Sequence, residues 1–297
     1  MMAIIHKRRG TIKCIALLGI VGLLGSYNCA AAEAVRTRGS PAVSNSECEV
    51  LHWDRTHYAH VYLPIRSSGK YCIDQDYRPS CSEWMGSCGS SAFLDIKAND
   101  VEIDLRGHTL SRSGRALEVF GQGKNISIKN GVIKNGSIHI RTPEVPSYYV
   151  INGTPPWVDP DFEVNSFTRI ENVRIVDGNI EVAGANVVVR NNEVSLGAGY
   201  LAPISIYGPY PIIEDNRLTR ATEPSKFPSF GIYLRAGNGA VVRGNTIENN
   251  GTRENATAIG LRDSKGVRVE NNGAENFDKF IERIGMSDEK EKGNTAR

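Results

Sequence analysis

The sequence predicts an all-β solenoid, in which short strands stack as successive coils of one chain. From Ala92 onward one theme recurs: a short alternating strand, a turn rich in Asn, Asp or Gly, and a second alternating strand. The theme is repeated about seven times with a period of roughly 21–28 residues, which is typical of repeat architectures. Alternating apolar residues indicate strands with one buried face. Because one repeat cannot bury that face alone, the repeats are expected to stack.

Residues 1–32 are predicted to be a secretory signal outside the fold. Their basic residues are Lys7, Arg8, Arg9 and Lys13. An apolar run from Ile15 to Leu24 follows, too short to favour a membrane-spanning helix, and three alanines precede Glu33. Cleavage is expected after Ala32, with lipid attachment at Cys29 as the alternative. The protein is thus expected to be secreted or periplasmic, without membrane contact after cleavage.

The charge balance argues against a nucleic-acid partner. The chain has 35 basic and 33 acidic residues, and four of the basic residues lie in the signal, so 31 remain against 33. The exported part keeps no basic block, so it is not expected to present a broad positive face.

Residues 33–46 are predicted to be a linker and residues 47–91 an N-terminal cap. The cap contains Cys48, Cys72, Cys81 and Cys88. An even number of cysteines in an oxidising compartment predicts two disulfides with three open connectivities. We favour Cys48 with Cys72 and Cys81 with Cys88. The spacings do not match the usual zinc-site patterns.

The solenoid itself is predicted over residues 92–276. A recurring turn amide suggests a ladder of Asn side chains along the axis, formed by Asn130, Asn172, Asn192, Asn216, Asn245 and Asn272. Residues 277–297 are expected to close the far end. Phe277, Phe280, Ile281 and Ile284 fall at helical spacing and predict a short capping helix, and the charged tail "MSDEKEKGNTAR" is expected to be disordered.

Stretches such as "VEIDLRGHTL" and "VVRGNTIENN" resemble the repeats of the right-handed parallel β-helix proteins, the superfold of the pectate lyases and many polysaccharide-processing enzymes. The resemblance covers residues 92–276, and "SGKYCIDQDY" resembles the strand that often precedes the first full coil. It implies a right-handed parallel β-helix and is specific for the fold rather than for an activity.

The resemblance implies no particular reaction. The chain lacks the paired aspartates and Gly-His-Gly pattern of the polygalacturonase-like hydrolases, the Arg-containing signature of the pectate lyases and the Asp-Pro-His-Asp motif of alginate epimerases. Function must therefore be argued from a site.

The first strand of each repeat predicts two columns of outward side chains, about 4.8 Å apart from coil to coil. The first column is expected to contain Asp95, Glu118, His139, Glu181, Ser205, Tyr233 and Gly260. The second is expected to contain Lys97, Phe120, Arg141, Ala183, Tyr207, Arg235 and Arg262. An ordinary solvated face would seldom have carboxylates in one column and cations with aromatic rings in the other. The alternative interpretation is that this is an ordinary solvated face.

An inserted loop, residues 142–166, interrupts the repeat directly after Arg141. It contains five prolines together with Tyr148, Tyr149 and Trp157, and is expected to form one wall of a groove. Loops 197–203, 219–230 and 249–257 are expected to form the other. Aromatic rings stack on pyranoses, and a guanidinium group binds a carboxylate through two hydrogen bonds. The groove therefore predicts an acidic polysaccharide or another glycan as ligand.

Two kinds of chemistry fit these residues. Glu118 and Glu181 are predicted to lie two coils apart, about 9.6 Å, near the upper limit for an inverting hydrolase. Asp95 and Glu118 are predicted to lie about 5 Å apart, which suits retaining hydrolysis or a shared calcium ion.

A lyase or an epimerase would instead need Arg141 or Lys97 to neutralise a uronate carboxylate, and His139 or Tyr233 to take the proton at C5. Calcium is the one cofactor considered, since no cofactor motif occurs. A non-catalytic glycan- or protein-binding envelope protein is the alternative function, and the oligomeric state is left open.

Overall fold

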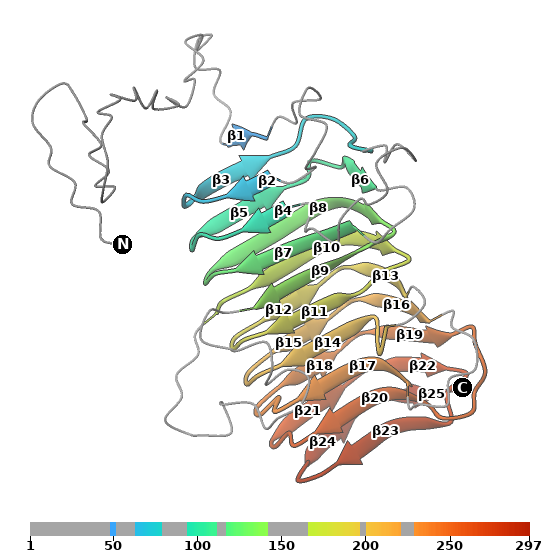
Figure 1. Ribbon diagram of the computed structural model, residues 1–297. Helices are drawn as coiled ribbons and strands as arrows, with labels where there is room; N and C mark the ends of the chain where they lie inside the picture. The colour runs from blue at the N-terminus through green and yellow to red at the C-terminus, as the bar shows by residue number, and fades with distance from the viewer. Residues whose placement is uncertain are drawn as a thin grey trace, which may run out of the picture. The chain divides into compact units, whose positions relative to one another are not determined.

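The computed structural model describes residues 48–51, 63–78, 94–111, 117–141, 166–196, 200–220 and 229–297. All regular secondary structure in these ranges is β-strand, so the predicted all-β class is confirmed. Neighbouring strands pair in parallel throughout, and the coils follow one another along a single stack (Figure 1). The predicted signal, the predicted linker and residues 142–165 of the inserted loop lie outside the described residues.

One sheet collects one strand from each coil. In the described ranges it has nine strands, in the order of the sequence. They are β2 (Leu63–Ile65), β4 (Leu94–Ile96), β7 (Leu117–Gln122), β9 (Gly136–Arg141), β11 (Ile180–Ala183), β14 (Ile204–Tyr207), β17 (Ser229–Arg235), β20 (Ala256–Arg262) and β23 (Lys279–Ile284).

The second sheet has sixteen described strands and bends along its middle into two arms. One arm contains β1 (Glu49–Val50), β3 (Gly69–Cys72), β5 (Val101–Asp104), β12 (Val188–Arg190), β15 (Ile212–Glu214), β18 (Val241–Arg243), β21 (Val267–Glu270) and β24 (Glu289–Lys292). The other contains β6 (Thr109–Ser111), β13 (Glu193–Leu196), β16 (Arg217–Arg220), β19 (Thr246–Asn249), β22 (Gly273–Glu275) and β25 (Thr295–Ala296).

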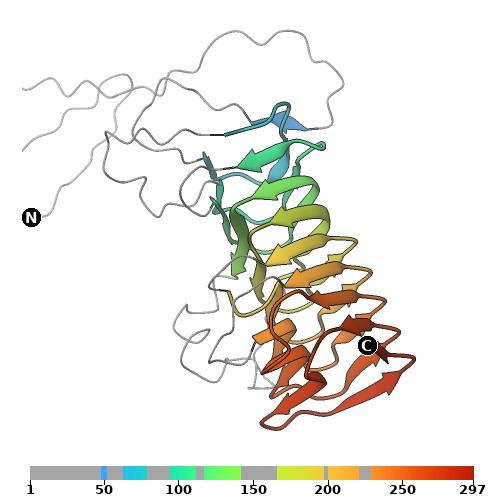
Figure 2. The ribbon, with the colours of Figure 1, turned by 90° about the vertical axis from the view of Figure 1, so that its right-hand side faces the viewer.

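Two long strands cross the bend and join the arms. These are β8 (Ile126–Lys134) and β10 (Arg169–Val176). β10 pairs with β12 through its first half and with β13 through its second half. A coil is therefore one strand of the nine-stranded sheet followed by one strand in each arm, and Figure 2 shows these coils edge-on.

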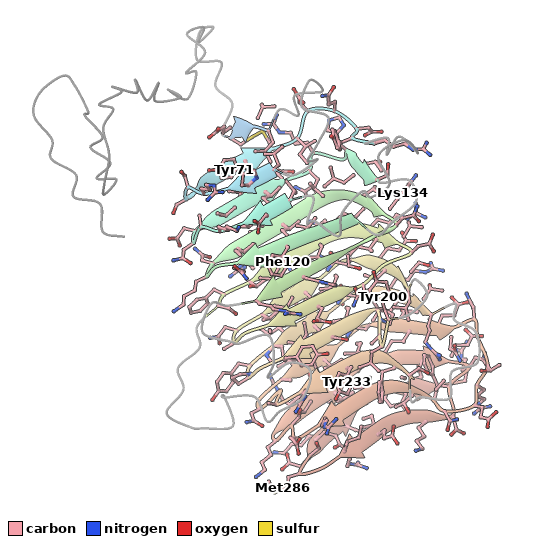
Figure 3. The ribbon with its side chains drawn as sticks, viewed as in Figure 1. Tyr71, Phe120, Lys134, Tyr200, Tyr233 and Met286 are labelled. Carbon is pink, nitrogen blue, oxygen red and sulfur yellow. A yellow bond between two sulfur atoms is a disulfide. The ribbon has the colours of Figure 1, made fainter. Side chains whose placement is uncertain are left out.

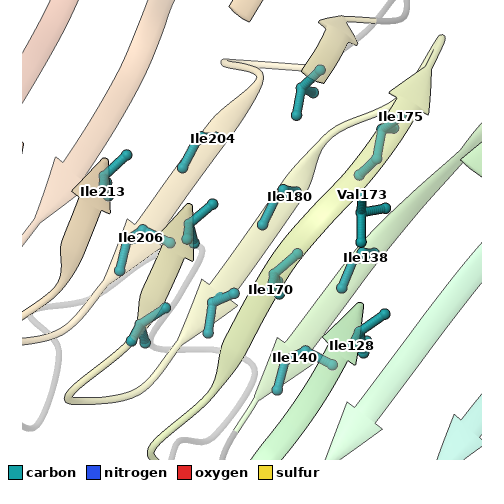
Figure 4. Packing of buried hydrophobic residues seen from close by; sticks show 14 of the residues in the cluster. Ile128, Ile138, Ile140, Ile170, Val173, Ile175, Ile180, Ile204, Ile206 and Ile213 are labelled. Carbon is teal, nitrogen blue, oxygen red and sulfur yellow. The ribbon is translucent and has the colours of Figure 1, made fainter. Parts of the chain in front are cut away.

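The core is the narrow space between the nine-stranded sheet and the two arms. Figure 4 shows Ile138 and Ile140 of β9 among Ile170 and Val173 of β10, and all four are at most 1% exposed. Alternate apolar residues of most strands point here, which explains why the alternation along the sequence predicted the fold. β-branched side chains dominate, as suits a pleated, densely packed interior.

A ladder of Asn side chains runs along the bend, as predicted, but with different members. Its amides donate from one coil to the next at 2.9–3.2 Å, through Asn192, Asn216, Asn245, Asn272 and, unpredicted, Asn294. Asn130 and Asn172 do not belong to it. They occupy the preceding position, where φ is positive (59° and 55°), and Asn172 donates to Asn130 at 3.3 Å.

The start of the solenoid lies earlier than predicted. β2 and β3 fall within the region interpreted as a cap, yet they already pair with β4 and β5 of the next coil. The strand predicted in "SGKYCIDQDY" is β3. The predicted disulfide between Cys48 and Cys72 is present and ties β1 to β3, whereas Cys81 and Cys88 lie outside the described residues.

The predicted capping helix is wrong, and so is the predicted disorder of the tail. Residues 279–284 form β23, and the tail forms β24 and β25. Arg283 and Glu289 occupy the inward positions that Leu261 and Val267 fill one coil earlier, and Arg283 Nε donates to Glu289 Oε2 at 2.8 Å. A charged pair, with the Arg283 side chain exposed and the Glu289 side chain buried, replaces the apolar contact, so hydrophobic periodicity gave no strand signal there.

Candidate functional site

The outward side chains of the nine-stranded sheet form the face that the sequence singled out, called here the outer face. Strand register places Asp95, Phe120, His139, Glu181, Ser205, Tyr233, Gly260 and Glu282 in its first column. The second column contains Gln122, Arg141, Ala183, Tyr207, Arg235, Arg262 and Ile284. Most of the predicted columns are thus confirmed.

The predicted position of Glu118 is wrong. Glu118 pairs with Ser137, and Phe120 takes its predicted place beside His139. The sequence misled because Gly121 fills an inward position, where an added Cβ would lie 2.6 Å from Ile140 Cδ1. Gly carries no apolar signal, so Leu117 and Val119 suggested a frame shifted by two residues. A two-residue shift keeps every side chain on its own face, so alternation alone cannot detect it.

The N-terminal end of the outer face holds a charged pair. Asp95 is almost fully buried, and its Oδ2 lies 2.8 Å from Lys97 Nζ. Lys97 follows β4 directly and remains partly exposed. Its ammonium group therefore already balances Asp95, and Phe120 separates this pair from His139 on the next coil.

The centre of the outer face combines an imidazole, a guanidinium and a carboxylate. His139 and Arg141 lie two residues apart on β9, and Glu181 is the neighbour of His139 on β11. Arg141 Nη2 donates to Glu181 Oε1 at 3.5 Å, which is a long contact. His139 Nε2 lies 3.4 Å from Asn179 Oδ1. These three side chains are half-buried, so each can reach a ligand on the face.

Aromatic rings follow on the next coils. The rings of Tyr207 and Tyr233 are 6.2 Å apart and nearly perpendicular, and the ring of Phe230 lies 5.0 Å from that of Tyr233. Together with Ala183 and Ala236 they form a buried cluster outside the main core. Figure 3 labels Phe120 and Tyr233, which lie on β7 and β17 of this face.

Sequence reasoning missed Phe230. Ile232 faces the core, and so does Gly231, whose added Cβ would lie 2.3 Å from the core residue Ile247. Two consecutive inward residues break the alternation and turn Phe230 outward, although the pairing with β20 keeps one residue opposite one. Its ring covers Gly260, where a Cβ would meet Phe230 at 2.4 Å. The "SFG" break in the pattern was the available signal.

Tyr207 is set among charged groups. Burial, followed by the nearby Glu181 carboxylate, raises the pKa of the Tyr207 phenol far above its ordinary value. Arg235 and Arg141 oppose this shift. Arg235 lies beside Tyr207 on the neighbouring strand and is 8% exposed. The phenol is thus held in its protonated form, as a hydrogen-bond donor.

The other predicted ligand-binding residues lie at the margins. Arg262 is next to Arg235 in the second column and is the more exposed of the two. Its Nε lies 3.9 Å from Asp263 Oδ2, which is at most a weak pairing. Trp157 lies outside the described residues, as does the predicted wall formed by residues 142–165.

The register argues against hydrolysis by two carboxylates of the first column. With Glu118 out of the column, the nearest outward carboxylates in the first column are Asp95 and Glu181. They lie three coils apart, about 14 Å between backbones. Inverting hydrolases need roughly 6.5–9.5 Å and retaining ones about 5–5.5 Å. The backbone distances predicted from Glu118 to Glu181 and to Asp95 are therefore wrong.

The described residues contain no group of three or more His, Cys, Asp or Glu side chains arranged to hold a metal ion. The calcium site predicted between Asp95 and Glu118 depended on a register that the strands do not adopt. In the same part of the chain, no helix is long and apolar enough to span a membrane.

The sheet arm containing β12 and β15 presents a different pattern, which sequence reasoning missed. One outward column alternates in charge at every coil, through Asp104, Lys129, Glu171, Arg190, Glu214, Arg243, Glu270 and Lys292. Contacts include Arg190 Nε to Glu171 Oε1 at 2.9 Å and Arg243 Nε to Glu214 Oε2 at 2.7 Å. This column neutralises itself, so it is a poor surface for a charged polymer.

A hollow of about 520 Å³ lies at the corner between β19 and β20, off the outer face. It is lined by Glu248, Asn249, Asn250, Arg253, Glu275, Asn276 and Arg297. Its polar groups are largely committed, because Asn249 and Asn276 donate to backbone carbonyls of each other and Arg253 Nε donates to the carbonyl of Phe277. We therefore place the candidate site on the outer face.

Comparison with known proteins gave one match. A family model described as "Right handed beta helix region" matches residues 85–281, which include all of the outer face except its last residues. No curated protein and no solved structure matches the chain.

Proposed function

Because the chain belongs to the right-handed β-helix family, its activity must be argued from this chain's own site, and we propose that the outer face binds an acidic polysaccharide. The observation that carries the proposal is the second column. It places Arg141, Tyr207, Arg235 and Arg262 along one line, with no acidic residue among its described members.

Spacing and chemistry support an extended acidic chain. Arg235 and Arg262 are on adjacent coils, about 4.8 Å apart, which is comparable with the length of one pyranose unit. A guanidinium binds a uronate carboxylate through two parallel hydrogen bonds. The rings of Tyr207, Tyr233 and Phe230 pack against one another and are at most 8% exposed, so they form an apolar floor beside the cations rather than an open stacking surface.

A second candidate function is elimination at a uronate, favoured by the proximity of His139 and Arg141 on one strand. Arg141 would neutralise the carboxylate, and His139 would take the C5 proton. The C4–O4 bond then breaks as a C4–C5 double bond forms, and a protonated phenol such as Tyr207 can return a proton to the departing oxygen. Epimerisation would use the same proton removal, followed by reprotonation from the opposite face.

The carboxylates of the first column are too far apart for a hydrolase. A non-catalytic envelope protein would use the same face for binding alone. Export belongs to the proposal as well. It is supported by the signal-like residues 1–32 and by the Cys48–Cys72 disulfide, which is expected in an oxidising compartment.

The test is binding and turnover of a panel containing polygalacturonate, alginate and hyaluronan. We expect at least one polymer to bind more weakly in high salt, and R235Q to weaken its affinity about tenfold or more. R268Q is the matched control, because Arg268 is an exposed arginine on the other sheet. Equal binding by R235Q and the wild type would remove the site.

Turnover separates the functions that share this face. Ultraviolet absorbance of unsaturated uronates, lost in H139Q while binding is kept, is expected for a lyase. New reducing ends without that absorbance would contradict elimination. Binding with neither product would identify the envelope-protein alternative.

A further inference from the structure

The corner between the nine-stranded sheet and the arm of β12 and β15 carries a column of residues in the left-handed conformation. Each lies two residues before the first outward residue of the following strand. The column runs through Asp100, Asn125, Phe167, Asn186, Tyr210, Gly239 and Gly266, with φ between 48° and 69°. Asp, Asn and Gly tolerate this conformation, but an aromatic residue there is an outlier. Phe167 and Tyr210 are therefore exceptions that need an explanation.

Packing does not explain them. Phe167 is 50% exposed and Tyr210 is 60% exposed, so neither ring fills the core. Asn186 occupies the same position on the coil between them, with φ 56°, so the corner itself does not require an aromatic side chain. Strain that persists without a packing reason points to a functional one.

The two rings lie on a narrow apolar strip. Val188 and Ile212 are half-buried outward neighbours, and Val241 continues the strip on the next coil. The Tyr210 ring lies against Gly239, where an added Cβ would be 2.8 Å from Cδ1, so a side chain at that position would displace the ring. The self-neutralising charge column borders the strip two residues further along each strand.

We propose that Phe167 and Tyr210 form a second, separate glycan site that binds a neutral β-linked polysaccharide. The rings are two coils apart, about 9.6 Å. In an extended β-1,4-linked chain alternate pyranoses turn the same face to one side, so two successive equivalent faces would meet the two rings. Val188, Ile212 and Val241 give the strip no charge of its own, and Arg169, 3.8 Å from Glu171 Oε1, and Arg268 lie at its two ends.

The width of the strip favours a polysaccharide over a protein. A stable protein interface covers about 800 Å² on each partner, whereas here a single line of apolar residues is bordered by charges. The site does not depend on the outer face or on its acidic ligand.

The test uses F167N, Y210N and the double variant, with cellohexaose and chitohexaose measured by calorimetry. On the coil between them this position is occupied by Asn186, so these variants remove the backbone strain and preserve the conformation of the corner. We expect the double variant to lose tenfold or more in affinity while its melting temperature stays equal or rises. M286N, at an exposed apolar residue elsewhere, and R235Q should bind like the wild type.

Four results would overturn the proposal. The first is that the wild type binds neither hexasaccharide, and the second is that the double variant binds as tightly as the wild type. The third is that R235Q loses binding. The fourth is that the wild type self-associates and the double variant does not, because the strip would then be a contact between copies. Binding that is unaffected by salt supports a neutral-sugar site and keeps this result distinct from the test of the outer face.

Discussion

Tyr207 is a buried side chain outside the main core whose phenol lies among charged groups. Its ring packs against Tyr233 and Ala183, while its phenol lies near Glu181 and two arginines. Desolvation disfavours the phenolate, and the carboxylate adds to that effect. The group can therefore donate a hydrogen bond to a ligand at every ordinary pH.

This has a measurable consequence at alkaline pH. A folded pKa above the unfolded value of 10.0 means that the contribution of Tyr207 to stability is complete below pH 10 and is lost as pH rises towards the folded pKa. We expect wild-type stability to fall by about 1.4 kcal/mol more per pH unit above 10 than that of Y207F. Denaturant unfolding at several pH values measures this, and equal slopes for the two proteins would contradict it.

The bend of the second sheet depends on a repeated pair of residues. A left-handed residue is followed by a buried Asn, as in Asp215–Asn216 and Gly244–Asn245. Asn216 Nδ2 donates to Val189 O and Asn245 Oδ1, and its Oδ1 accepts from Asn192. The side chain thus satisfies backbone groups that the bend removes from strand pairing.

Replacement of one ladder residue should therefore leave several buried polar groups without partners. We expect N216A to lower the free energy of unfolding by about 2–4 kcal/mol. N172G is the matched control, because Asn172 is exposed and its positive φ suits Gly, so little change is expected. Similar effects of the two variants in denaturant unfolding would show that the ladder adds no special stability.

The charge column of the second sheet has a bearing on stacking. In this column each charged residue lies beside a residue of opposite charge on the next coil. If the stacking slipped by one coil, like charges would become neighbours, which is unfavourable in adjacent strands. Each exposed pair contributes little alone. As a column they favour one register, in a sheet whose apolar positions are similar from coil to coil.

The whole stack is tied at its first described coil. The Cys48–Cys72 disulfide spans 24 residues and holds β1 against β3. Constraining the unfolded chain over that distance is worth about 3 kcal/mol. We expect the double variant C48S/C72S to unfold at a correspondingly lower denaturant concentration, with the outer face still able to bind its ligand.

The matched variant C81S/C88S tests the other predicted pairing. A comparable loss of stability would support a second disulfide. No loss of stability in C48S/C72S would mean that the described strand pairing alone holds the first coil.

The sequence by itself determined the class of fold, the repeat and most of the outer face. It could do so because alternation reports which side of a strand is buried, and parallel stacking turns that periodicity into columns. Asp95, His139, Glu181, Tyr233 and their neighbours followed from this directly.

Only the tertiary structure decided the register and the ends. Gly121 hid a two-residue shift that moved Glu118 out of line, and the inward Gly231 before Ile232 turned Phe230 outward. The last described coil pairs Arg283 with Glu289 where the preceding coil has Leu261 and Val267, and a capping helix and a disordered tail were expected there. In each case the decisive contact is made between neighbouring coils, by a residue that adds nothing to the hydrophobic pattern. The periodicity along a single strand does not report such contacts.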